Sequence, residues 1–243
     1  HMLINESIMW LRKNRGEIHD EELLAALLSF VEMVAETNIE NEKKAEHFKW
    51  AMGFHSAFDE AEINVLIRVR VSELICNAGL QREQMKAVYE SLVWFINHLT
   101  YSYTRDGQFT DHRREHPYEK MAFVFEDDYK FYRIYALSKV MVSMSKVGLV
   151  VDDIIKELND LVEELKAADH YTQLSAIKNL PVAMSEMGNF EKAINLAAEI
   201  IDPDARSTAL IGMIDSLLEA GIEERVKIDY LHKIRDLALE INE

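Results

Sequence analysis

The sequence predicts an all-α protein: a solenoid of about five antiparallel helical hairpins with an N-terminal capping helix and one inserted loop. Three observations lead to this prediction. Residues that break helices are rare, turn residues recur between apolar stretches, and apolar residues stand at fixed distances before each turn. A chain of this kind alternates long helices with short turns.

The first observation concerns composition. Among 243 residues there are only 8 glycines and 3 prolines. A sandwich or barrel needs many tight turns built from these residues, so their scarcity favours helices. The chain is 49% hydrophobic and 29% charged, which is typical of a folded domain rather than a disordered segment.

The second observation is a set of five turn positions, each after an apolar stretch. Glycine and asparagine tolerate the left-handed conformation in which many helices end. An aspartate, which can cap the free amides of a helix start, stands 18 to 20 residues before each turn. The predicted turns are Asn38, Gly79, Gly148, Gly188 and Gly221, and the predicted starts are Asp20, Asp59, Asp128, Asp169 and Asp202.

The third observation is that residues at equal distances before the turns match in character. Steps of four along a helix place residues on one face, so these columns predict buried stripes. Eight residues before the turns stand Phe30, Val71, Val140, Leu180 and Met213. Four residues before them stand Val34, Ile75, Met144, Met184 and Leu217. Twelve residues before them stand mostly small residues: Ala26, Ile67, Ala136, Ala176 and Ala209.

The remaining elements follow in chain order within a single domain over 1–243. A capping helix over 2–16, closed by Gly16, precedes the first hairpin. Residues 105–127 change in composition and are predicted to be an insertion between the second and third hairpins. Pro181 lies in an otherwise helical run and predicts a kink there. The second helices of the hairpins are predicted over 39–56, 80–104, 150–167, 189–200 and 222–241.

Residues 170–220 resemble a tetratricopeptide repeat. Gly188, Ala193, Ala197 and Pro203 stand where the second half of that repeat has its glycine, its alanine, a helix-packing residue and its proline. The tryptophan and tyrosine usual in the first repeat helix are missing. The resemblance implies a right-handed superhelix of antiparallel helices and a role in binding proteins or peptides, and it implies no activity.

Charge and cysteine content narrow the class of partner. The net charge of −16 repels phosphate backbones, which argues against nucleic acid and favours basic or neutral proteins. The single cysteine, Cys76, cannot form an internal disulfide, and its apolar helical surroundings predict a buried, inert thiol. With no apolar run of about 20 residues and no signal-peptide pattern, we expect a cytoplasmic protein that is not in a membrane.

One motif has the spacing of a metal site. His112-Arg-Arg-Glu-His116 fits the H-x-x-E-H pattern of inverted zinc peptidases, in which two histidines on one helix face bind zinc and a glutamate acts as general base. Pro117 follows at once, and two arginines would place positive charge beside the cation. A metal-dependent hydrolase using His112, Glu115 and His116 is therefore kept as the alternative to a non-enzymatic protein that needs no cofactor.

Two surfaces are candidates for partner binding. The first surface is the insertion with its flanks, where aromatic and basic residues are concentrated; it includes Tyr101, Tyr103, Arg113 and Arg114. Such side chains supply binding hot spots. Alternatively, the insertion folds its aromatic residues onto the groove of the array itself. The second surface is one wall of the groove along the first helices of the hairpins. Its predicted residues are Arg68, Arg70, Tyr132, Tyr135 and Lys139.

The wall would suit a carboxylate, a phosphate or an acidic peptide. Its arginines could instead form salt bridges with neighbouring acids such as Glu73. We therefore expect an interaction scaffold or adaptor that holds a peptide or helix of another protein in its concave groove. A small-ligand sensor with the same fold is a further alternative, and a homodimer stays open.

Overall fold

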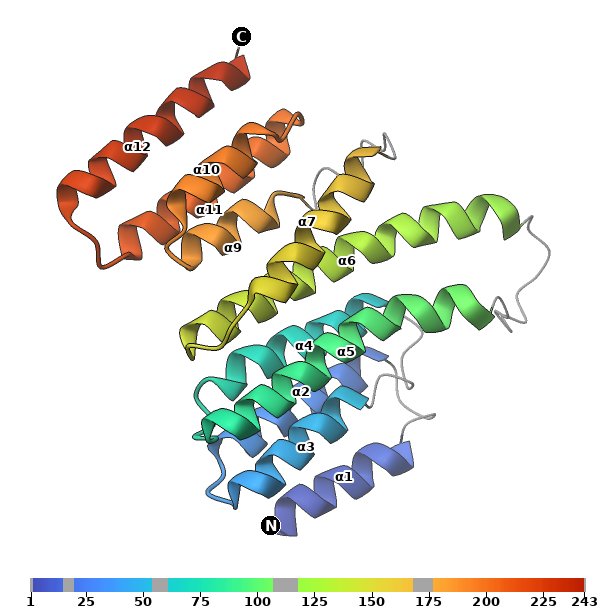
Figure 1. Ribbon diagram of the computed structural model, residues 1–243. Coiled ribbons are helices and arrows are strands. Elements are labelled where there is room, and N and C mark those ends of the chain that lie inside the picture. The colour runs from blue at the N-terminus through green and yellow to red at the C-terminus, as the bar shows by residue number, and fades with distance from the viewer. Residues whose placement is uncertain (1, 15–19, 54–60, 107–117, 168–176, 243) are drawn as a thin grey trace. The chain divides into compact units, whose positions relative to one another are not determined.

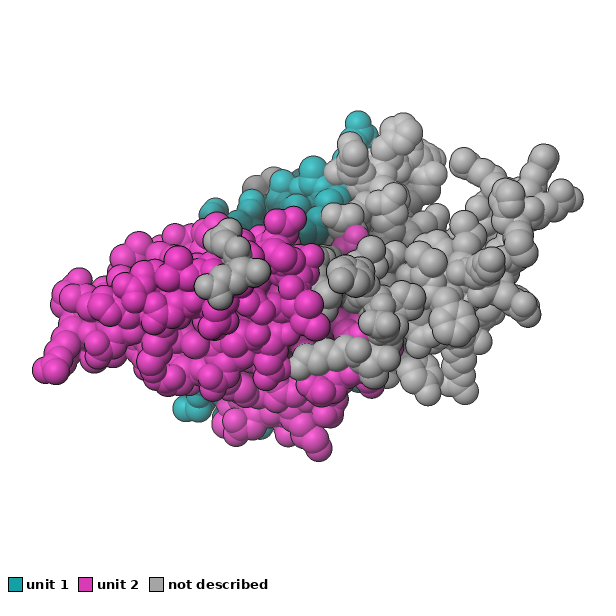
Figure 2. All heavy atoms as spheres, turned by 90° about the horizontal axis from the view of Figure 1, so that it is seen from above, with its two compact units in different colours: residues 1–116, 146–149 teal, residues 117–145, 150–243 magenta. Residues whose placement is uncertain are grey.

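The computed structural model describes residues 2–14, 20–53, 61–106, 118–167 and 177–242, and every regular element in these ranges is a helix. The chain divides into two compact units, residues 1–116 with 146–149 and residues 117–145 with 150–243 (Figure 2). Each unit is described by itself. The single domain over 1–243 stays a prediction.

The first unit holds a capping helix and two hairpins (Figure 1). Its helices are α1 (Met2–Asn14), α2 (Asp20–Glu36), α3 (Asn41–Gly53), α4 (Ala61–Ile75) and α5 (Arg82–Asp106). Helix α1 packs on α2, α2 packs along α3, and α4 packs along α5. Helix α4 also packs against both α2 and α3, while α5 packs against α3. The second hairpin is thus seated on the first.

The second unit repeats this arrangement at its C-terminal end. Its helices are α6 (Tyr118–Lys146), α7 (Asp152–Ala167), α9 (Asn179–Glu186), α10 (Phe190–Ala198), α11 (Pro203–Glu219) and α12 (Glu224–Leu239), followed by a 3₁₀ turn, η3 (Glu240–Asn242). Helices α9 and α10 pack together, and α11 packs against both of them. Helix α12 packs on α10 and α11. The α11/α12 hairpin is therefore seated on the α9/α10 hairpin.

The predicted turns fall between helices at all five positions. Gly79, Gly148 and Gly188 have φ of 72°, 71° and 79°, the left-handed conformation that favours glycine. Gly221 does not, so that part of the prediction is wrong. Helix α11 ends at Glu219. Ala220, directly before Gly221, already has an extended backbone with φ −65° and ψ 134°.

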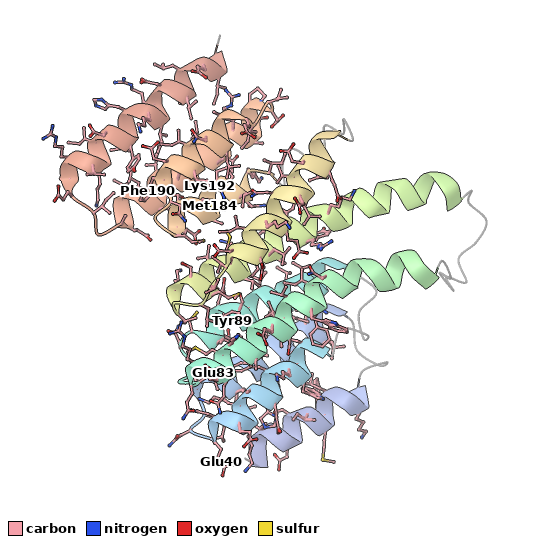
Figure 3. The ribbon with its side chains drawn as sticks, in the orientation of Figure 1. Glu40, Glu83, Tyr89, Met184, Phe190 and Lys192 are labelled. Atoms are coloured by element: carbon pink, nitrogen blue, oxygen red, sulfur yellow. The ribbon has the colours of Figure 1, made fainter. Side chains whose placement is uncertain are left out.

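The two apolar columns, eight and four residues before the turns, are confirmed as the core. All ten of their residues are buried, which is what a face repeating every four residues requires. Figure 3 labels one of them, Met184 on α9, and also the buried Phe190 at the start of α10. In the column of small residues Ile67, Ala136 and Ala209 are buried.

The predicted helix start is right at Asp202, where a cap forms, and wrong at Asp128, where the residues before it are also helical. Asp202 caps α11, since its Oδ1 accepts a hydrogen bond from the Ala205 amide at 2.7 Å. Helix α6 begins at Tyr118 instead of Asp128, because residues 118–127 contain no glycine or proline. Helices α5 and α6 thus extend into the predicted insertion, of which 107–117 lie outside the described residues.

A break in the helical backbone stands just before Pro181. Ile177 is helical, Lys178 is a turn residue with φ −55° and ψ −27°, and α9 begins at Asn179. Proline has no N–H to donate to the carbonyl oxygen four residues earlier, which here is that of Ile177. The kink within one longer helix stays a prediction, since residues 168–176 lie outside the described part.

Gly212 on α11 lies close to α9, the helix against which α11 packs. A Cβ on Gly212 would lie 2.7 Å from Cγ2 of Val182 on α9. We expect Gly212→Ala to lower the free energy of unfolding by about 1 kcal/mol, since overpacking of about 1–3 kcal/mol outweighs the better helix propensity of alanine. Urea unfolding followed by circular dichroism measures this change. In a Val182→Ala background the same substitution should be neutral or stabilising; an equal loss there would contradict the contact.

Candidate functional site

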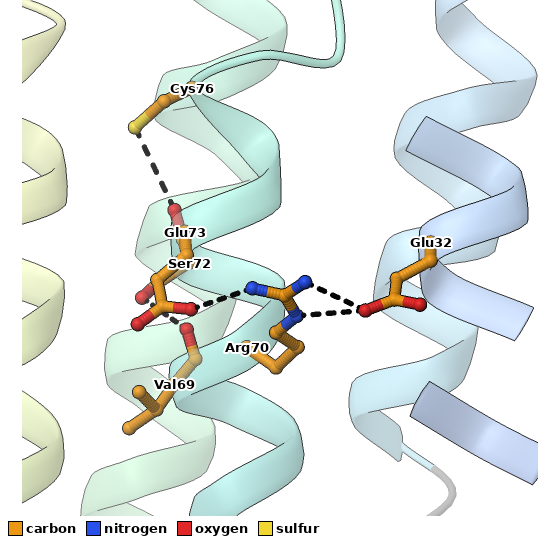
Figure 4. Close-up of polar contacts among 6 residues, drawn as sticks. All are labelled: Glu32, Val69, Arg70, Ser72, Glu73 and Cys76. Carbon is orange, nitrogen blue, oxygen red and sulfur yellow. Dashed lines mark hydrogen bonds and ion pairs between the residues drawn. The ribbon is translucent and has the colours of Figure 1, made fainter. Parts of the chain in front are cut away.

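Arg70, on α4, is the wall residue whose surroundings are best described. Its Nη2 donates to Oε1 of Glu32 on α2 at 2.7 Å, and its Nη1 donates to Oε2 of Glu73 at 3.1 Å (Figure 4). These hydrogen bonds, the one to Glu32 first, raise the pKa of Arg70. The side chain is 41% exposed. Arg70 therefore lies at the surface with its charge balanced by two carboxylates.

Arg68, also on α4, lies in the interior rather than on the wall. It is only 1% exposed, and its guanidinium carbon stands 5.7 Å from the centre of the Phe95 ring on α5. Burial lowers the pKa of Arg68 to about 9. Counted from the turns, it stands where the other hairpins place Leu27, Leu137, Ile177 and Leu210, all buried. That register, eleven residues before each turn, is the sequence feature that could have identified it as a core position.

Tyr132, Tyr135 and Lys139 lie half-buried on α6, in the second unit. Nζ of Lys139 forms an ion pair with Glu186 of α9 at 3.6 Å. The wall residues of α4 belong to the first unit. Arg68 and Arg70 thus share helix α4, with Arg68 facing the interior and Arg70 the surface. The other three predicted wall residues, Tyr132, Tyr135 and Lys139, lie together on α6.

The other predicted residues cannot be placed by their side chains. Tyr101 and Tyr103 lie in the last turns of α5, and their side chains are outside the described part. Arg113, Arg114 and the motif residues His112, Glu115 and His116 also lie outside it. Within the described ranges, no group of three or more His, Cys, Asp or Glu side chains is placed to hold a metal ion. None of the described helices has the length and apolar composition that crossing a bilayer requires.

Two lysines that the sequence analysis missed connect helix ends. Nζ of Lys44 on α3 donates to the carbonyl oxygens of Ala35 and Ala78 at 2.9 and 2.7 Å; Ala35 lies in the last turn of α2 and Ala78 in the turn that follows α4. Nζ of Lys227 on α12 donates to the carbonyl oxygen of Leu218 in α11 at 3.1 Å. Cations at helix C-termini satisfy free carbonyls and favour the negative end of the dipole. Both lysines stand six residues after a turn, a register that could have revealed them.

An apolar groove of about 660 Å³ runs between α11 and α12. Helix α11 contributes Ser207, Leu210, Ile211 and Ile214, and α12 with η3 contributes Leu231, His232, Ile234, Arg235, Ala238 and Ile241. Ile211 and, beside the groove, Leu218 are 61% and 60% exposed. Isolated exposed apolar residues are ordinary, whereas here apolar residues of both helices line one groove.

Comparison with family models, with curated proteins and with solved structures finds no match to this chain.

Proposed function

We propose that the chain is a right-handed solenoid of about five antiparallel helical hairpins, of the tetratricopeptide kind, that binds a peptide or helix of another protein. The binding surface is the edge formed by the first helices of the hairpins. The protein acts by holding a partner rather than by making or breaking bonds.

One observation carries this proposal: the contact between successive first helices recurs at the same pair of positions in both units. In the first unit, Glu32, six residues before its turn, meets Arg70, nine residues before the next turn. In the second unit, the same register pairs Val182 with Gly212. A contact that repeats in register is what stacking of equivalent hairpins requires, and stacked hairpins create the extended surfaces that solenoid proteins use for binding.

The residues nine before each turn also stay at the surface, although the column beside them is buried. None of the five is buried: Ser29, Arg70, Lys139, Asn179 and Gly212. Arg70 and Lys139 are held in ion pairs with Glu32, Glu73 and Glu186, so this edge offers charges of both signs. The acidic balance of the whole chain favours a basic or neutral partner.

An affinity capture from the native lysate tests this proposal. The wild type is compared with the double variant Arg70→Gln and Lys139→Gln, and with Lys86→Gln, which removes an exposed cation from the second helix α5. We expect a partner identified by mass spectrometry that the wild type and Lys86→Gln retain and the double variant loses at least tenfold. A partner retained equally by all three proteins, or none by any, contradicts binding at this edge.

A further inference from the structure

The seat of α4 on the α2/α3 hairpin shows how this chain binds a helix. On α2, the residues ten, seven and three before the turn are Leu28, Val31 and Ala35, which are buried or half-buried beneath the next hairpin. Glu32, six before the turn, accepts two hydrogen bonds from the guanidinium of Arg70. Lys44, six after the turn, donates to the carbonyl oxygens of Ala35 and of Ala78, which is in the turn that follows α4. The seat thus combines an apolar stripe, an acid and a lysine.

The α11/α12 hairpin carries the same three features in the same register. Ile211, Ile214 and Leu218 stand ten, seven and three residues before Gly221, and Asp215 stands six before it. Lys227, six after Gly221, already donates to the carbonyl of Leu218, as Lys44 does to that of Ala35. The sequence and the geometry of the seat are therefore reproduced.

What differs is the cover. The residues of the other first helices at the ten, seven and three positions are buried or half-buried wherever the structure describes them, including Pro181 and Ser185 under α11. Ile211 and Leu218 are more than half exposed, and the groove beside them is about 660 Å³. In the described part of the chain, no helix packs on α11 and α12 in the position that α4 takes on α2 and α3.

From these observations we infer that the α11/α12 groove binds an amphipathic helix of a partner protein, one that presents a lysine or arginine to Asp215 as α4 presents Arg70 to Glu32. The apolar stripe of that helix covers Ile211 and Leu218. Its C-terminal carbonyls accept from Lys227, which is half-exposed, in the way the carbonyl of Ala78 accepts from the buried Lys44. An acidic residue in place of the lysine or arginine would stand against the Asp215 carboxylate and be repelled. This surface uses other residues than the edge formed by Arg70 and Lys139.

A synthetic peptide tests the inference with the full chain. The probe has the sequence of residues 61–79 with Arg68→Leu and Cys76→Ser, two added N-terminal lysines and a fluorescein label, and its matched partner also carries Arg70→Glu. We expect fluorescence anisotropy to show binding of the first peptide and at least tenfold weaker binding of the second. In an Asp215→Lys protein the order of the two peptides should reverse, because the charge at the seat is reversed.

Two further variants distinguish binding in this groove from non-specific binding to exposed apolar residues. Ile211→Glu, in the groove, together with Leu218→Glu, in the same apolar stripe of α11, should abolish binding. Ile201→Glu, at a residue that is 73% exposed and lies outside both the groove and the stripe, should leave it unchanged. Circular dichroism confirms that each variant is folded. All these substitutions lie at exposed positions, and Asp215→Lys keeps the test valid if the double variant does not fold.

Three results would overturn the inference. These are no binding, equal binding of the two peptides, and an order that Asp215→Lys does not reverse. Sedimentation showing a dimer that Leu218→Glu dissociates would assign the groove to a second copy of this chain, and would also overturn it. The Arg70→Gln, Lys139→Gln protein should bind the peptide normally, so failure of the proposed function and failure of this inference remain distinguishable.

Discussion

Replacing Lys44 by methionine is expected to lower the free energy of unfolding by about 3 kcal/mol. Lys44 is 7% exposed, and its Nζ is hydrogen-bonded to the carbonyl oxygens of Ala35 and Ala78. Methionine fills a similar volume but leaves both acceptors without this donor, and each buried acceptor left unpaired costs about 1–3 kcal/mol. The cost of burying the ammonium, which also lowers the pKa of Lys44, offsets part of this loss.

Urea unfolding of both proteins measures the effect, and the adjacent Lys43 provides the control. Lys43 is exposed and pairs with Glu40 across one helical turn. An exposed pair of this kind contributes little, so Lys43→Met should change the free energy of unfolding by less than about 1 kcal/mol. If the two variants were equally stable, the bridge between α2 and α4 would contribute no more than a surface ion pair.

Replacing Arg68 by leucine is expected to raise the free energy of unfolding by about 2 kcal/mol at neutral pH. The guanidinium is buried, and its lowered pKa of about 9 reports the cost of holding the charge away from water. Leucine is the residue found at the equivalent position in three other hairpins: Leu27, Leu137 and Leu210. Keeping an ionised side chain out of water costs on the order of several kcal/mol, a cost that leucine does not carry.

The gain from Arg68→Leu should shrink as the pH rises. Below pH 9 Arg68 is protonated in both the folded and the unfolded chain, so the cost of burial is fully present. Between pH 9 and the higher ordinary pKa of arginine, the unfolded chain holds a proton that the folded chain has lost, so the stability of the wild type rises with pH.

Measuring the free energy of unfolding of both proteins between about pH 7 and pH 10 checks this trend. For the control Arg70→Gln, the difference from the wild type should not decrease with pH. A leucine variant less stable than the wild type at pH 7 would show that contacts of the guanidinium stabilise the fold by more than its burial costs.

Local patterns in the sequence determined most of the helices. The five turn positions and the second helices were predicted within a few residues, because helix periodicity, glycine at turns and an aspartate cap act over one or two turns of chain. The errors arose where the local pattern was ambiguous. Helix α6 begins at Tyr118 because no glycine or proline lies between Tyr118 and Asp128.

The binding wall shows the limit of the same reasoning. Arg68 and Arg70 are two residues apart and alike in type, yet one is buried beside Phe95 and the other is paired at the surface with Glu32 and Glu73. Their residue type does not separate them. The register eleven residues before the turn marks Arg68 as a core position, but Phe95 and Glu32, which decide the two environments, lie on α5 and α2. The salt bridge to Glu73, expected from the sequence as an alternative to ligand binding, forms together with one to Glu32.

The sequence by itself thus determined that this is a helical chain, where its turns fall and which columns form the core, since each depends on neighbours within about one hairpin. The tertiary structure alone decided which charges turn inward and which apolar residues stay uncovered. Lys44 is buried because α4 covers it, whereas Lys227, in the same register, remains half-exposed beside an apolar groove. Burial depends on what packs above a residue, and the pattern of its own helix does not contain that information.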